Sequence, residues 1–388
     1  MSGMAEWIME NKDKIEKGVE ILGKGCEILA ATVGQFHPVL EAVFMVSAEL
    51  LGNPDGGEAK YLAEQFESVN QKLEKVQSEI KKTELVLQRS SLNIQYFKPY
   101  TQIINQYEMF KYIFKAKPKF KKLKVDEFLI HFEEYEGDKN LECLYDAITK
   151  ENASGHAMLD TILVTEQRSR RAVEEFCACL KKVFVVGIIS LMGYTALNEG
   201  SVGQDMVKKW QDRMEDVEKR MKAAVDECVS NFVEQAKTDL EQKLKESESS
   251  VDPEYAKSIL DALVEKYDWV SWSVRVFKDD GIFLFGKRHH VKSGGVNYFE
   301  HLGNNKIKIV VSFTDDPKPL DKVQIKDQIE KGKQKGNMQS MAESLSENFP
   351  NCLVHAVSSS KVKEANNFNP EHFYYIYHKT AYICIHTE

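Results

Sequence analysis

The middle of the chain holds a run of fifteen residues without a charged side chain, from Val183 to Leu197. Charged, amphipathic stretches flank the run, and only Ser190 and Thr195 interrupt its apolar and glycine residues. A helix that packs one face against a core shows polar residues every third or fourth position, so this run needs apolar cover on every side. As a helix it would be about 22 Å long, short of the roughly 30 Å of a bilayer's hydrocarbon core. We expect either a buried central helix or hairpin, or a segment that is stored until it meets lipid.

A second apolar region extends from Ile15 to Leu51 and is predicted to form two helices. His37 and Pro38 divide them, because the residue before a proline is pushed out of the α region and proline suits the first helical position. The turn residues from Gly52 to Gly57 end the second helix. Residues 1–57 are therefore expected to be apolar helices that pack on the rest of the protein.

From Glu58 the pattern becomes that of a long, polar helix with a narrow apolar stripe, and a matching stripe begins near Met206 and continues to about Leu244. Alternating spacings of three and four residues are those of a heptad seam, and two helices with such stripes are expected to pack against each other. Residues 58–250 are thus predicted to form an elongated antiparallel helical bundle around the central run, residues 183–197. The seam residues are Leu62, Phe66, Val69, Leu73, Val76 and Ile80 in the first stripe and Trp210, Met214, Val217 and Met221 in the second.

An acidic, serine-rich stretch from Lys243 to Pro253 indicates a domain boundary. Beyond it, a short helix over 255–266 is followed by alternating strand patterns, a hairpin signal at Gly303 with two asparagines, helices near 321–331 and 339–348, and a closing aromatic strand over 373–385. Residues 251–388 are predicted to be a small α+β domain. The expected fold class is mainly α, with this C-terminal α+β domain attached.

Charge and cysteine usage narrow the function. A net charge of −8 over 388 residues argues against nucleic-acid binding, which needs a basic excess. Basic character is local, between Lys115 and Lys124, where we expect a solvated loop face, with contact to anionic lipid as the alternative. Seven scattered cysteines without a C-x-x-C pair favour a reducing compartment over a disulfide framework or a zinc site. With no signal-peptide pattern evident, the expected location is cytoplasmic or peripheral to a membrane.

The patterns in the sequence that resemble catalytic or metal-binding motifs each lack a required feature. The stretch from Gly18 to Gly25 imitates a phosphate-binding loop but has glycine where the magnesium-binding hydroxyl belongs, and no apolar strand precedes it. His289 and His290 point to opposite faces of a strand, so we expect an exposed strand-end pair and no metal site. Cys177 and Cys179 face different sides of a helix. We expect no enzymatic activity, no cofactor, no metal and no small-molecule substrate.

The chain resembles the rapunzel family of fish proteins and, more distantly, the helical part of the cnidarian porin-type jellyfish toxins. The resemblance rests on the glycine-spaced apolar helices near the N-terminus, the heptad helix from Glu58, the segment Val186–Ala196 before a second charged helix, and Lys266–Val270 at the start of the C-terminal region. The rapunzel resemblance implies an intracellular or membrane-associated protein without known enzymatic activity that is linked to skeletal and fin development. The toxin resemblance implies pore formation.

Two functional hypotheses follow. The first is a helical-bundle protein that releases the central run, together with residues 28–51, onto a lipid membrane and self-associates there. The second is a non-enzymatic intracellular scaffold that binds other proteins through its coiled-coil helices and its C-terminal domain. For the first, the membrane-insertion candidates are Val183, Phe184, Val186, Ile188, Ile189, Leu191, Met192, Tyr194 and Leu197 in the central run, and Ile28, Leu29, Val33, Val39, Leu40, Val43 and Phe44 near the N-terminus.

Overall fold

The computed structural model describes residues 93–150, 157–199, 203–246, 250–279, 290–331, 338–358, 361–378 and 381–388, with single positions among residues 13–16 and 64–74. The expected apolar helices before residue 57, with the insertion candidates Ile28 to Phe44, and the first seam, Leu62 to Ile80, lie outside the described residues. The chain divides into two compact units, Met1–Ser230 and Asn231–Glu388.

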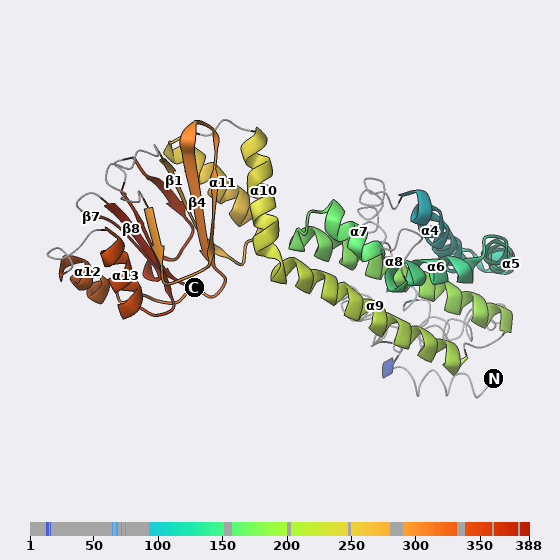
Figure 1. Cartoon of the computed structure of the whole chain (residues 1–388). Helices are drawn as coiled ribbons and strands as arrows, with labels where there is room; N and C mark the ends of the chain where they lie inside the picture. Colours follow the sequence, from blue (N-terminus) through green and yellow to red (C-terminus); the bar gives the residue numbers. More distant parts are fainter. Residues whose placement is uncertain are drawn as a thin grey trace. The chain divides into compact units, whose positions relative to one another are not determined.

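The first unit is a helical bundle around one long apolar helix (Figure 1). Its helices are α4 (Asn93–Lys115), α5 (Pro118–Glu134), α6 (Gly137–Thr149), α7 (Met158–Thr165), α8 (Arg170–Glu199) and α9 (Gln204–Ser230). Helix α8 contains the uncharged run and packs against α4, α5, α6 and α9. This arrangement confirms the expected mainly α fold with a buried apolar central helix.

The basic stretch between Lys115 and Lys124, expected as a loop, is mostly helical. Helix α5 begins at Pro118. Proline lacks a backbone N–H, which costs nothing in the first turn because an N–H there has no acceptor within the helix. The loop between α4 and α5 is therefore short, consisting of Ala116 and Lys117. Most of the lysines belong to the first half of α5.

The second apolar stripe does not form one helix over 206–244. The helix breaks at Asn231, and α10 (Phe232–Glu246) joins the core of the second unit through Phe232, Ala236, Leu240 and Leu244. The second unit thus begins about twenty residues before the expected boundary at residue 250. Tertiary packing explains the difference, because the Phe232 ring lies 5.9 Å from that of Trp272 and 5.4 Å from that of Phe313.

The second unit contains two four-stranded antiparallel sheets between helices, which confirms the expected α+β domain (Figure 1). One sheet has the order β3 (Tyr298–Leu302), β4 (Ile307–Thr314), β1 (Ser271–Lys278), β6 (Lys363–Asn366), and the other β2 (His290–Ser293), β5 (Cys352–Val357), β8 (Ala381–Thr387), β7 (Phe373–His378). Helix α11 (Pro253–Lys266) packs on the first sheet, and α12 (Lys322–Lys331) and α13 (Met338–Asn348) pack on the second. Short 3-10 turns lie at Asn304–Lys306 and Pro370–His372.

Strand alternation builds the layers of this unit. On β1, Trp272, Val274 and Val276 enter the core shared with α11, whereas Arg275 points the other way and reaches Cys384 of the second sheet. The two sheets therefore lie face to face, with helices outside both of them. The hairpin expected at Gly303 joins β3 to β4 as predicted. The expected single closing strand over 373–385 is instead the hairpin of β7 and β8, in which Phe373 pairs with His386.

A buried polar layer lies between the sheets. Arg275 is only 1% exposed, and its guanidinium donates hydrogen bonds to the Ser273 and Ser312 hydroxyls at 3.0 and 2.9 Å and to the Cys384 sulfur at 2.8 Å. The His386 Nε2 atom lies 2.8 Å from the Ser312 hydroxyl, and its Nδ1–H donates to the Thr387 carbonyl at 2.7 Å. Because a carbonyl oxygen only accepts, the proton of the neutral ring is on Nδ1, and Nε2 accepts from Ser312.

His290 also contributes to this layer and is not the exposed strand-end residue that the sequence suggested. Its ring is partly buried, 5.7 Å from that of Phe277 and 6.0 Å from that of His355. Burial, together with the nearby Lys308 ammonium, lowers the pKa of His290 to about 4. His289 lies outside the described residues.

Acid is expected to destabilise the second unit. Burial lowers the pKa of His386 from 6.5 to about 4, and burial lowers that of His355 well below its usual range. As the pH falls below 6.5, the unfolded chain takes up these protons first, so the stability is fully present above pH 6.5 and is lost toward pH 4. For His386 alone the loss at pH 5 is about 2 kcal/mol. Denaturant unfolding at several pH values measures it. A His386→Gln variant is expected to show a shallower pH dependence, and an unchanged slope would contradict the assignment.

Candidate membrane-insertion helix

Helix α8 is longer than the uncharged run that identified it. It has 30 residues, because the charged segment from Arg170 to Lys182 belongs to the same helix as the run. At 1.5 Å per residue, α8 is about 45 Å long. The uncharged run itself keeps its expected length of about 22 Å, but the helix that contains it is about twice as long. Within the described part of the chain, Arg170–Asn198 is the one helix long and apolar enough to cross a membrane, and 83% of its most apolar stretch is buried inside the protein.

The candidate residues of the central run occupy the core of the first unit. Val183, Phe184, Val186, Ile188, Ile189, Leu191 and Met192 are buried, and Tyr194 and Leu197 are partly buried. The second-seam residues Trp210, Met214, Val217 and Met221, all on α9, are buried in the same core. In the folded protein the apolar run is therefore covered, as its composition requires.

Two glycines let neighbouring helices approach α8 closely. A methyl group added at Gly193 would lie 2.5 Å from the ring of Phe110 on α4, and one added at Gly187 would lie 2.7 Å from the Leu141 Cδ1 atom on α6. The Phe110 ring is itself held by Phe128 of α5, with ring centres 5.3 Å apart. The glycines in the run are thus explained by close packing.

The hydroxyls of Ser190 and Thr195, within the run, are satisfied by α8 itself. The Ser190 hydroxyl donates to the Val186 carbonyl at 2.8 Å, and the Thr195 hydroxyl donates to the Leu191 carbonyl at 3.0 Å. Such bonds to the preceding turn are available to a helix in any surroundings. No other helix has to supply a partner for either hydroxyl.

Polar contacts tie α8 to its neighbours near the ends of the run. The Tyr194 hydroxyl donates to Glu133 of α5 at 2.7 Å, and its ring stacks on Phe132 with centres 4.5 Å apart. Glu133 is exposed and accepts this bond. The Lys181 ammonium lies 3.9 Å from Glu218 of α9.

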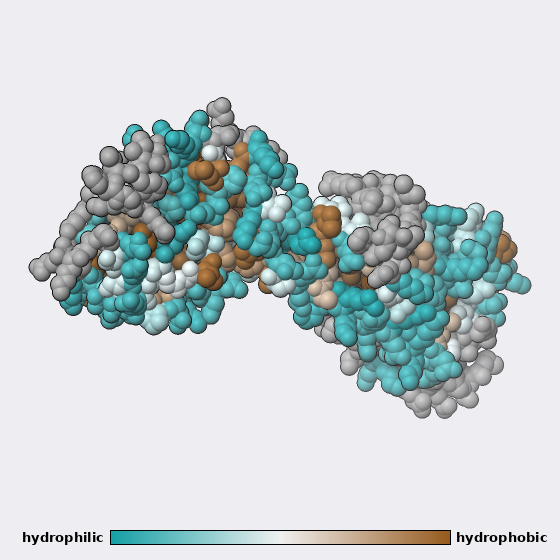
Figure 2. All heavy atoms as spheres, in the orientation of Figure 1, coloured by the Kyte–Doolittle hydropathy of each residue, from teal (hydrophilic) through white to brown (hydrophobic). Residues whose placement is uncertain are grey.

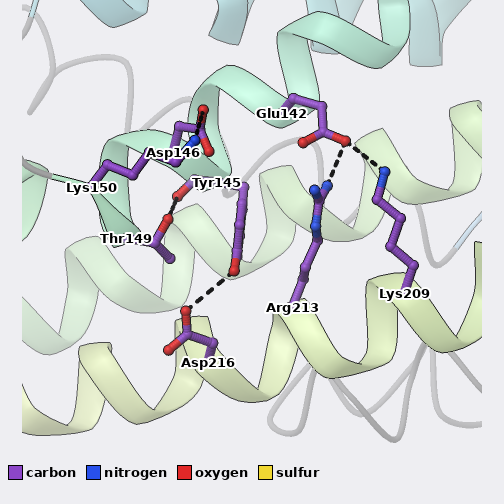
Figure 3. Close-up of polar contacts among 8 residues, drawn as sticks. All are labelled: Glu142, Tyr145, Asp146, Thr149, Lys150, Lys209, Arg213 and Asp216. Carbon is purple, nitrogen blue, oxygen red and sulfur yellow. Dashed lines mark hydrogen bonds and ion pairs between the residues drawn. The ribbon is translucent and has the colours of Figure 1, made fainter.

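Polar side chains also join α6 to α9, two of the helices that pack on α8 (Figure 3). We call Glu142, Tyr145, Lys209 and Arg213 the α6–α9 polar cluster. Glu142 contacts the Arg213 guanidinium at 2.5 Å and the Lys209 ammonium at 2.9 Å. The Arg213 guanidinium also lies over the rings of Tyr145 and Trp210, 4.7 and 4.8 Å from their centres. Burial alone would raise the pKa of Glu142, but hydrogen bonds from Arg213 and Lys209 hold it below its usual range.

Sequence reasoning missed this cluster, because its members look like ordinary solvated charges. Arg213 is the clearest available signal. It directly precedes the seam residue Met214, so the cation lies beside the apolar stripe. Its stacking on aromatic rings is a contact that a planar guanidinium makes readily.

The cysteines beside the run are buried thiols. Burial raises the pKa of Cys177 on α8 to about 12 and that of Cys228 on α9 to about 11. A thiol with such a pKa is a weak nucleophile at neutral pH, because the thiolate is the reactive form. Among the residues with described positions, no group of three or more His, Cys, Asp or Glu side chains is placed to hold a metal ion.

The two glycines are expected to differ in their tolerance of alanine. Gly193→Ala should destabilise the first unit by about 1–3 kcal/mol, because the Phe110 ring cannot move away without disturbing its packing. Gly187→Ala meets the Leu141 Cδ1 atom at 2.7 Å and the Ile103 Cγ2 atom at 3.2 Å, but the leucine end can move and alanine gains helix propensity, so its loss should be smaller than that of Gly193→Ala. Denaturant unfolding followed by circular dichroism measures both. Equal effects would refute the proposed close contact at Gly193.

Removing the charge of Glu142 should weaken the α6–α9 polar cluster. Glu142→Gln leaves the partly buried Arg213 without its carboxylate, and we expect a loss of about 1–2 kcal/mol in the stability of the first unit. Asp226→Asn breaks an exposed ion pair with Lys222 on α9 and serves as the matched control, with an expected loss below about 0.5 kcal/mol. A Glu142→Gln effect no larger than that of the control would show that the cluster contributes little.

Comparisons with known proteins agree with this architecture. Residues 53–250, about half of the chain, match the family described as the cephalotoxin-like middle helical domain. The chain is also similar to Protein rapunzel of Danio rerio, with 26% identity over 229 residues that cover 57% of this chain and 97% of the relative. No solved structure matches the chain. The expected rapunzel and toxin-like resemblances are thereby confirmed, and the chain belongs to the family of proteins with a cephalotoxin-like middle helical domain.

Proposed function

We propose that this chain is a membrane-interacting, pore-forming protein that stores α8 inside a helical bundle and inserts it into lipid, where the protein self-associates. The observation that carries the proposal is α8 itself: a helix long enough to span a bilayer, uncharged from Val183 to Leu197 and with its Ser190 and Thr195 hydroxyls bonded within the helix. Backbone and hydroxyl groups satisfied in this way are what a bilayer demands of a spanning segment. The toxin-like description of the matched family supports the same class of function.

The energetics make insertion plausible only if the bundle opens. Burying a fifteen-residue apolar helix in lipid supplies on the order of ten kcal/mol at about 25 cal/mol per Å², before ordering costs are subtracted. The bundle already provides much of this burial, so the net gain is small. Once α8 leaves, the inner faces of α4, α6 and α9 lose their cover, and association between copies would restore it. Self-association is therefore part of the proposal.

A charge placed within the run cannot test the proposal by itself. Ile188 is 2% exposed, so Ile188→Asp would bury a carboxylate in the bundle core and is expected to unfold the first unit. A reversible lock on the native protein is a sharper test. Tyr194 and Glu133 suit it, because they touch across the α8–α5 contact and neither is fully buried.

The lock consists of cysteines at both positions, Glu133→Cys and Tyr194→Cys, bridged by a short bismaleimide in a background with Cys26→Ser and Cys143→Ser. Release of a trapped dye from liposomes is measured before and after bridging. We expect leakage from the unbridged protein and a loss of at least about tenfold in its rate after bridging, because α8 is then held to α5. The control is the same bridge within one helix, at Asp146→Cys and Lys150→Cys of α6, which should leave leakage unchanged.

Leakage that is the same with and without the lock would contradict release of α8 from α5. Absence of leakage from all variants, on neutral and anionic vesicles and over a range of pH, would overturn the proposal. Labelling of Cys177 with a maleimide gives a second readout in the unmodified chain. The thiol is buried in the bundle, so faster labelling on vesicles than in buffer is expected if α8 leaves its cover.

The second candidate function is a non-enzymatic intracellular scaffold, and the similarity to Protein rapunzel favours it. In that case α8 would remain the core helix in which it lies here, and the protein would act through surfaces of both units. Light scattering over a concentration series distinguishes the two. A stable oligomer in buffer that ignores liposomes supports the scaffold. Both candidates include the proposal that the protein needs no cofactor and acts on no small-molecule substrate, at a cytoplasmic or peripheral membrane location.

A further inference from the structure

Helix α5 exposes large apolar side chains, two of them, Phe120 and Leu123, in its first half. Phe120 is 46% exposed, Leu123 53% and Ile130 64%, and Tyr112 near the end of α4 is exposed as well. Leu123 and Ile130 are seven residues apart and share one face of α5. Phe128 lies on the opposite face and is buried against the bundle. Figure 2 shows hydrophobic atoms among hydrophilic ones at the α5 end of the first unit.

Six lysines accompany these side chains between residues 115 and 124, and the same stretch holds no acidic residue. Lys115 pairs with Glu74, and Lys124 pairs with Glu127 at 2.6 Å. Lys117, Lys119 and Lys122 are exposed and form no ion pair with any residue that the structure describes; the Lys119 ammonium lies 4.8 Å from the centre of the Phe120 ring. These three lysines therefore carry positive charge that no described carboxylate pairs with.

The start of α5 adds to this positive potential. Lys117 occupies the N-cap position, its side chain makes no capping hydrogen bond, and the first turn contains no acidic residue. The N-terminus of a helix carries a partial positive charge and unsatisfied N–H groups, and proteins usually place acidic side chains there. Lysines at such a position are unfavourable until an anion approaches.

We infer that the first half of α5 is a docking surface for anionic phospholipid, with Lys117, Lys119 and Lys122 at the phosphate level and Phe120 and Leu123 in the outer acyl region. A soluble anion would satisfy the lysines but would leave the apolar side chains in water, whereas a lipid surface accommodates both. The inference rests on the proposed membrane function and names its first contact.

The opposite face of α5 connects this surface to the stored helix. Phe132 of α5 stacks on Tyr194 of α8, and Phe128 packs on the Phe110 ring that fills the space beside Gly193. Docking through α5 thus brings a covering helix of α8 to the lipid, so the surface lies where release of α8 would begin.

Vesicle co-sedimentation of the full chain tests the inference, with phosphatidylcholine vesicles with and without phosphatidylserine. Lys119→Glu with Lys122→Glu should lower the partition coefficient on anionic vesicles by at least about thirtyfold, since each basic residue near such a surface contributes about 1 kcal/mol and the new carboxylates add repulsion. Phe120→Ser with Leu123→Ser should lower it by about tenfold. Added salt should weaken the binding of the parent chain.

Matched controls change other exposed residues of the same unit. Lys208→Glu with Lys219→Glu on α9 gives the same change of net charge, and Val164→Ser on α7 removes an exposed apolar side chain. Both controls should bind like the parent chain. Because all substituted residues are exposed, circular dichroism spectra should not change.

Equal losses of vesicle binding in the α5 and α9 variants would overturn the inference. So would a parent protein that does not bind anionic vesicles, or one that soluble glycerophosphoserine displaces from them, because a free headgroup would then suffice for binding. Dye release separates this failure from that of the proposed function. Leakage that survives in the α5 variants overturns the docking surface alone. Binding that depends on α5 but never causes leakage supports the docking surface and overturns pore formation. A chain that neither binds nor leaks overturns both.

Discussion

The need to cover an uncharged helix on every side determines the architecture of the first unit. A helix with one polar face needs neighbours on only one side, whereas the run from Val183 to Leu197 offers no face to water. Helices α4, α5, α6 and α9 pack around it, and the amphipathic pattern of α9 follows from that role, with Trp210 and Met214 turned inward. The glycines at 187 and 193 bring two of these helices closer than any larger residue would allow.

Much of this could be predicted from the sequence, because burial has a simple pattern. The run, the α9 stripe, α11 and the hairpin at Gly303 all follow from local periodicity or turn chemistry. Contacts between distant segments had no such signal. The break at Asn231 depends on aromatic rings around Phe232 that come from β1 and β4, and β7 pairs with β8 within what the sequence presents as one continuous aromatic stretch. The apolar run also did not indicate the full length of α8, since charged residues up to Lys182 continue a helix that apolar content alone would end.

The two units place their polar groups differently. In the first, charged contacts such as those of Glu142 and Tyr194 lie at the edges of an apolar core. In the second, Arg275, Ser312 and His386 are buried between the sheets. Polar groups at an edge can exchange their partners for water when helices separate, whereas buried ones lose theirs outright. Separation of the helices in the first unit would therefore cost these edge contacts less than separation of the sheets would cost the polar groups of the second unit.

The hydrogen bonds between the sheets also carry a direction. The Arg275 guanidinium can only donate, the Ser312 hydroxyl accepts from it and donates onward, and His386 ends the chain of donors at the Thr387 carbonyl. Sliding one sheet past the other by a residue pair would leave a buried cation facing apolar side chains, at a cost of several kcal/mol. Apolar contacts between flat sheets tolerate many offsets, but this chain of donors accepts one. Burying Arg275 thus costs some stability but restricts the two sheets to one relative register.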